Sequence, residues 1–214
     1  MLVCGILASL LYVAMNIITA VLYEGYSAFS QTVSELSAIG APTRPLWVSL
    51  GVVYSLLVIA FGWGVRHSAS GSRPLRIAGV LFMAIGVIGF FWPPMHQREV
   101  IAAGGGTLSD TLHIAFTFIT VPLMMLAMGY GAAVFGKRFR FYSIASLVLM
   151  FAFGMLTGLD SSKLEANLPT PWMGVWERIN IGLYMLWVVV FAMLLLRRAQ
   201  AADTPRVKQM PVLS

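Results

Sequence analysis

Three side chains suited to acid–base or metal chemistry lie near the ends of long apolar segments: Glu35, His113 and Glu177. Carboxylates and imidazoles transfer protons and hold metal ions. Asp110 precedes His113 by three residues, which places both on one face of a helix. Such a pair can orient the imidazole as a general base or as a metal ligand. The alternative is that Asp110 only caps a helix and that His113 is a polar residue at its end.

Glu35 belongs to the polar stretch SQTVSELSAIG, residues 30–40. Thr32 and Glu35 have the spacing of a capping box, in which a hydroxyl and a carboxylate bind the first free N–H groups of a helix. We predict a short amphipathic helix over 33–39, within about 32–40, at the membrane interface. Glu35 is then either this cap or a carboxylate that points into a pocket.

Glu177 begins a polar stripe on the last apolar segment, followed by Asn180 and Tyr184 at helical spacing. Arg178 lies beside it. Ionisable groups inside a membrane helix usually face the protein interior or a wet cavity, and they have a partner. The alternative to a ligand site is an Arg–carboxylate pair that only holds helices together.

The candidates divide by chemistry. Catalytic candidates are Glu35, Asp110, His113 and Glu177, and ligand-binding candidates are Ser34, His96, Asp160, Arg178, Asn180 and Tyr184. His96 and His113 are the candidate metal ligands, but no HExxH or HxxxH pair exists, so the metal and any other cofactor stay unknown. An Asp110–His113 pair could instead activate a hydroxyl, and the candidates are Ser34, Ser161 and Ser162.

The elements that position these residues follow from composition. Of the 214 residues, 59% are hydrophobic and 10% are charged, against about 25% charged in soluble domains. A membrane helix needs about 20 mostly apolar residues, and its backbone polar groups must be satisfied within the segment. Six runs qualify, at 2–23, 46–65, 75–92, 112–135, 141–159 and 173–196. We predict an all-α polytopic membrane protein, with one six-helix domain over 1–198 and a flexible tail over 199–214. Asp160 to Ser162 are expected to end the fifth helix.

Basic residues predict the orientation, because cytoplasmic loops of membrane proteins are rich in Lys and Arg. The connections 66–74 and 136–140, the start of the third helix and the tail hold ten basic residues and one acid, Asp203. The other connections and helix ends hold four basic residues and seven acids. Both termini are therefore expected in the cytoplasm of a cell-membrane protein, and the candidates face outward.

The net charge of +6 does not indicate nucleic-acid binding, because the basic residues lie in separate short loops and line no single face. The expected partners are the lipid bilayer and a lipid or small amphiphile. The oligomeric state stays open.

Two segments and a histidine resemble the DUF998 family of bacterial and archaeal membrane proteins. The segments are SELSAIGAPTRPLW, residues 34–47, and GVWERINIGLYMLW, residues 174–187, with His113 between them. The resemblance covers most of the chain and implies a six-helix membrane fold. The family's function is unknown, so the resemblance implies no reaction. It groups Glu35, His113 and Glu177 as one set.

Three functions stay open at this point. The polar residues could line an outward vestibule that binds or transports a lipid or small amphiphile, with Arg178 or Arg44 at an anionic head group. They could form the His–carboxylate site of a lipid-acting hydrolase or transferase at the outer leaflet, with or without a metal. The chain could also be a non-catalytic accessory subunit.

Overall fold

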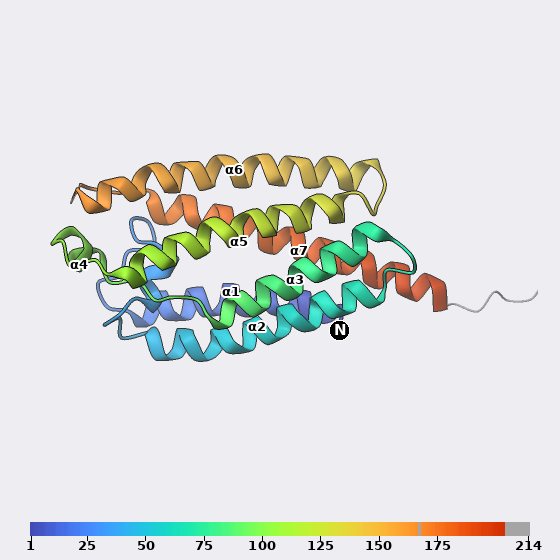
Figure 1. The fold of residues 1–214 in the computed structure, drawn as a ribbon, viewed down its shortest axis with the longest axis horizontal. Helices are drawn as coiled ribbons and strands as arrows, with labels where there is room; N and C mark the ends of the chain where they lie inside the picture. The colour runs from blue at the N-terminus through green and yellow to red at the C-terminus, as the bar shows by residue number, and fades with distance from the viewer. Residues whose placement is uncertain (167, 204–214) are drawn as a thin grey trace, which may run out of the picture.

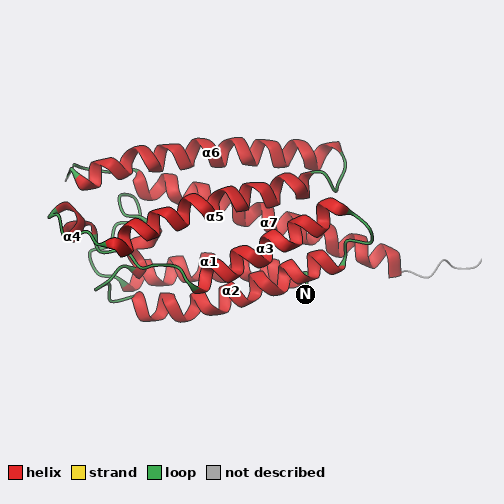
Figure 2. Ribbon diagram, viewed as in Figure 1, coloured by secondary structure: helices red, strands yellow, loops and turns green. Residues whose placement is uncertain are grey.

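The computed structural model describes residues 1–166 and 168–203. Figures 1 and 2 show long helices that run side by side along the longest axis of the molecule. The elements are α1 (Val3–Leu22), η1 (Val33–Ser37), α2 (Arg44–His67), α3 (Arg73–Phe90), α4 (Arg98–Ala102), α5 (Leu108–Ala132), α6 (Lys137–Glu165) and α7 (Met173–Asp203). Six of these helices are long and apolar enough to cross a membrane. The chain is a multi-pass membrane protein with an all-helical fold.

The six long helices pack in a closed ring, in the order α1, α2, α3, α5, α6 and α7. The α2–α3 hairpin is the closest pair because glycines face each other: a Cβ on Gly62 would lie 2.7 Å from the carbonyl oxygen of Gly79. Aromatic side chains fill the interior, with ring centroids 4.8 Å apart between Phe61 and Phe82 and between Trp187 and Phe191. The outer faces carry exposed apolar side chains such as Phe118, as a lipid-facing surface requires.

The two ends of the bundle differ. At one end, here called the η1 end, lie η1, α4, the connections 23–43 and 91–107, and residues 168–172 before α7 (Figure 1). At the other end, here called the basic end, lie the connections 68–72 and 133–136 and the last turns of α7. The candidate residues that sequence analysis placed in one group of connections are therefore at one end of the molecule.

Several boundaries differ from the sequence prediction. The element predicted over 33–39 is a 3-10 helix of five residues. The α6 helix continues to Glu165, so the prediction that Asp160 to Ser162 end it is wrong. The two serine hydroxyls donate to carbonyls of the preceding turn, and the Asp160 carboxylate pairs with Lys163 on the same helix. The α7 helix runs to Asp203, and the rest of the predicted tail, 204–214, lies outside the described residues.

Candidate functional site

Three consecutive residues of η1 each contact a different helix of the η1 end. The Val33 N–H donates to the Glu177 carboxylate of α7. The Ser34 hydroxyl lies 3.0 Å from Nε2 of His113 on α5. The Glu35 carboxylate pairs with Arg98 of α4. Glu177 and His113 thus contact two neighbouring residues of η1, and Glu35 is the third residue of the same segment.

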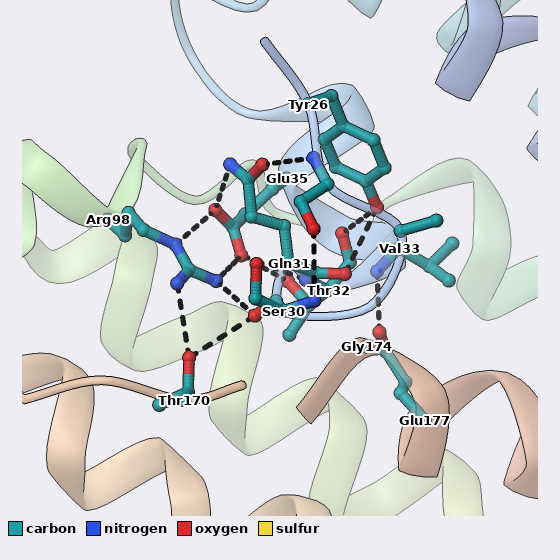
Figure 3. A network of polar contacts seen from close by, with 12 residues as sticks. Tyr26, Ser30, Gln31, Thr32, Val33, Glu35, Arg98, Thr170, Gly174 and Glu177 are labelled. Atoms are coloured by element: carbon teal, nitrogen blue, oxygen red, sulfur yellow. Dashed lines mark hydrogen bonds and ion pairs between the residues drawn. The ribbon is translucent and has the colours of Figure 1, made fainter. Parts of the chain in front are cut away.

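Glu35 is held by two hydrogen bonds from the Arg98 guanidinium, at 2.8 Å from Nε and 2.6 Å from Nη2 (Figure 3). The side chain of Glu35 is only 2% exposed. Further donors are the Gln31 side-chain amide at 3.1 Å and the Thr32 backbone N–H at 2.9 Å. The second of these belongs to the predicted capping box, which is confirmed. A carboxylate whose oxygens already accept this many hydrogen bonds from the chain serves as an anchor for the segment.

Arg98 is the residue that sequence analysis missed, since it was counted there only as a charge. Its guanidinium also donates to the Ser30 carbonyl and to the Thr170 hydroxyl (Figure 3). Hydrogen bonding to Glu35 raises the pKa of Arg98, although partial burial opposes the shift. The sequence feature that could have identified Arg98 is its isolation, because no other Lys or Arg occurs between Arg76 and Lys137.

His113 is oriented by a backbone carbonyl. Its Nδ1 has two neighbours that call for opposite tautomers: the Pro93 carbonyl oxygen at 2.8 Å can only accept, and the Trp92 indole N–H at 3.2 Å can only donate. The shorter contact, to Pro93, favours the neutral ring with its proton on Nδ1. In that tautomer Nε2 accepts the hydroxyl proton of Ser34. The Trp92 ring lies edge-on against the imidazole. His113 is 6% exposed and Ser34 is half-buried.

Asp110 pairs with His96 across the loop. The carboxylate accepts the His96 backbone N–H at 2.6 Å and contacts its Nδ1 at 2.8 Å. It also accepts the Thr107 backbone N–H, because Thr107 is the N-cap of α5 and Asp110 completes its capping box. The alternative that Asp110 is itself the cap is therefore wrong by three positions, although its carboxylate takes part in the capping box. The structure gives no hydrogen bond between Asp110 and His113.

Arg178 fastens the first connection to α7. Its guanidinium donates to the carbonyls of Ala28 and Gln31, to the Tyr26 hydroxyl and to the Asn16 side chain. Burial raises the pKa of Tyr26 to about 12 even though Arg178 opposes the shift. The phenol therefore keeps its proton and donates a hydrogen bond of 2.7 Å to the Thr32 carbonyl. Arg178 is occupied by the protein's own acceptors.

The three residues of the polar stripe predicted on the last helix have three different environments. Glu177 reaches η1, whereas the Asn180 amide donates to the Met150 carbonyl of α6. Tyr184 is buried in the hydrophobic core. Asp160 pairs with Lys163 one turn along α6, at 2.6 Å. No hydrogen bond or ion pair therefore joins Asn180, Tyr184 or Asp160 to the described residues of η1.

A metal site of three or more ligands is absent from residues 1–166 and 168–203, which contain no close group of three His, Cys, Asp or Glu side chains. The two candidate metal ligands have separate partners. His96 contacts Asp110 and His113 contacts Ser34. The contact between Ser34 and His113 joins a hydroxyl to an imidazole.

Comparison with known proteins places the chain by sequence. No curated protein and no solved structure matches it. The family model described as "Protein of unknown function (DUF998)" matches residues 6–194. This match includes η1, α4, the histidine of α5 and the glutamate–arginine pair of α7. The chain belongs to the DUF998 family.

Proposed function

We propose that this protein is a cell-membrane hydrolase or transferase that acts on an ester of a lipid or small amphiphile, with Ser34 as nucleophile and His113 as general base. Both termini lie in the cytoplasm and the η1 end faces outward. The observation that carries the proposal is the 3.0 Å contact between the Ser34 hydroxyl and His113, with Nδ1 of the ring held by the Pro93 carbonyl. A hydroxyl, a base and a group that orients the base form the arrangement that activates a nucleophile.

The chemistry follows from the tautomer. Nε2 of His113 takes the Ser34 proton as Oγ attacks the ester carbonyl, and the imidazolium returns that proton to the departing alcohol. The ester bond breaks and an acyl–serine forms. Water, or a second alcohol in a transferase, then gives its proton to Nε2 and attacks the acyl group, which regenerates Ser34. No metal is needed for any of these proton transfers.

The location favours a membrane-borne substrate. The base belongs to α5, one of the spanning helices, and apolar side chains near the site are exposed, including Phe91, Leu108 and Leu112. An amphiphile in the bilayer would therefore present its ester at the depth of this helix end. Arg178 and Arg44, the head-group partners expected from the sequence, donate instead to carbonyls of the chain.

A non-catalytic accessory role is the second candidate, and one observation favours it. The charged groups around η1 are joined to each other or to backbone carbonyls, with Glu35 on Arg98 and Arg178 on Ala28 and Gln31. Such an arrangement also serves a protein that only needs a rigid outer surface for a partner.

The test uses the purified protein in lipid nanodiscs with a fluorophosphonate probe, followed by peptide mass spectrometry. The proposal expects covalent labelling at Ser34 that is lost in Ser34→Ala and reduced at least about 100-fold in His113→Gln, in line with loss of a general base. Ser37→Ala is the matched control, because Ser37 lies on the same 3-10 helix and donates only to the Ser34 carbonyl. An unlabelled native protein that is correctly folded would leave the accessory role.

Orientation needs its own test. In a Cys4→Ser background, Gly106→Cys at the η1 end and Gly136→Cys at the basic end replace exposed residues. A membrane-impermeant maleimide added to intact cells should label only the first. Labelling of the second alone would reverse the orientation.

A further inference from the structure

The basic end carries a groove that the proposed activity does not use. It has a volume of about 420 Å³ and is open to the outside of the bundle. Three arginines and three aliphatic side chains line it: Arg66, Arg73, Arg76, Ile77, Val80 and Leu81. The first of these comes from the end of α2 and the others from α3. Both helices are among the spanning segments.

The three arginines of the groove are exposed and have no fixed counter-charge. No side-chain hydrogen bond or ion pair joins Arg66, Arg73 or Arg76 to any other described residue. The ion pairs among the described residues lie at the η1 end and involve other groups. This concentration of charge on a short hairpin is unfavourable without an anionic partner. A guanidinium is suited to phosphate because its planar set of donors matches two phosphate oxygens.

The lining changes from charged to apolar along α3. Arg73 and Arg76 lie in the first turn, and Ile77, Val80 and Leu81 follow on the same face at helical spacing. At 1.5 Å per residue, the eight steps from Arg73 to Leu81 cover roughly 12 Å of helix. Since α3 spans the membrane, its arginines lie at head-group depth and its aliphatic residues at acyl-chain depth.

We propose that this groove binds one anionic glycerophospholipid, with its phosphate on the three arginines and an acyl chain along Ile77, Val80 and Leu81. The arginines alone would accept any phosphate. The aliphatic continuation selects a lipid, because a soluble phosphate gains nothing from it. This site is separate from the Ser34–His113 pair, and it stands or falls independently of the proposed enzyme.

Native mass spectrometry of the delipidated protein in detergent tests the site, with phosphatidylglycerol, phosphatidylcholine and soluble glycerol phosphate as probes. The groove variant is Arg66→Gln/Arg73→Gln/Arg76→Gln. The matched control, Lys137→Gln/Arg138→Gln/Arg140→Gln, removes the same charge from exposed residues at the same end, outside the groove. A third variant, Val80→Trp, fills the acyl part and keeps the arginines.

The proposal expects phosphatidylglycerol to bind the native protein more tightly than phosphatidylcholine does. Its affinity should fall at least about tenfold in the groove variant and less than about twofold in the control. Val80→Trp should weaken the lipid and leave glycerol phosphate unchanged. Equal losses of phosphatidylglycerol affinity in the two charge variants would mean that the lipid is attracted only by the overall positive charge of this end, and the proposal would be wrong. It would also be wrong if phosphatidylcholine bound equally well, or if Val80→Trp had no effect on the lipid. The lipid comparison and Val80→Trp still decide the matter if the groove variant does not fold.

Discussion

The two ends of the bundle use arginine in opposite ways. At the η1 end, Arg98 and Arg178 are directed into the protein and donate to Glu35 and to backbone carbonyls. At the basic end, Arg66, Arg73 and Arg76 are exposed and have no ion-pair partner in the described chain. The residue type is the same, but the acceptors are inside the protein at one end and outside it at the other.

The difference shows where each set of charges acts. A buried ion needs partners from the chain itself, and removing one partner leaves the other buried and uncompensated. An exposed arginine keeps its hydration or meets lipid phosphates, so its loss has little effect on folding. We therefore expect charges at the η1 end to determine stability, and charges at the basic end to determine what the surface attracts.

The largest effect is expected for Arg98→Ala. The change leaves Glu35 buried without its counter-charge and should lower the free energy of unfolding by about 3–5 kcal/mol. Steric trapping or an SDS titration measures it. Glu35→Gln in the same background should restore part of the loss, because the uncompensated charge is then gone. A loss below about 1 kcal/mol would show that the pair is not a structural anchor.

The second prediction concerns Gly174, where α7 touches the first connection. A Cβ there would overlap the carbonyl oxygens of Ala28 and Gln31. Gly174→Ala should therefore cost about 1–3 kcal/mol, the usual range for an overpacked contact. Gly182→Ala on the same helix is the control, since a Cβ there meets nothing within 4 Å. Similar losses for the two variants would argue against close packing at Gly174.

The third prediction tests the start of α5. Thr107 accepts the Ser109 N–H and forms a capping box with Asp110. Thr107→Ala should lower the free energy of unfolding by about 1 kcal/mol. Thr107→Ser keeps the hydroxyl and should lower it less. If both variants were equally unstable, the methyl group would matter and the cap would not.

The smallest effect on stability is expected at the basic end. Arg73→Gln in a detergent without lipid should change the free energy of unfolding by no more than about 0.5 kcal/mol. Added phosphatidylglycerol should stabilise the native protein more than the variant, because a ligand that binds only the folded state adds to its stability. A large loss without lipid would mean that the arginine contacts the protein itself.

The fold was largely predictable from the sequence. Each spanning helix is a long apolar run, and hydropathy alone identifies such a run because lipid offers no partners to the backbone. Polar helix ends were less predictable: α6 continues through Asp160 to Glu165, because Asp160 finds its partner, Lys163, one turn along the same helix. The capping box of Thr32 and Glu35 was also predictable, because it depends only on local spacing.

The partners at the η1 end were not predictable in the same way. Asp110 and His113 share a helix face, yet the Asp110 carboxylate pairs with His96 and the His113 imidazole contacts Ser34. Those partners come from loops whose path depends on backbone contacts, such as the 2.7 Å bond from the Ile39 N–H to the Met95 carbonyl. Helical spacing carries no information on such long-range contacts. The role of Arg98 was missed for the same reason.

The bond between the Val33 N–H and Glu177 joins residues 144 positions apart. Ribosomes complete the first connection long before they synthesise α7, so η1 must wait for its last partner until nearly the whole chain has entered the membrane. A nascent chain that stops before Glu177 would hold its first connection without Glu177 or Arg178. A segment that is synthesised early is thus among the last to gain all of its contacts.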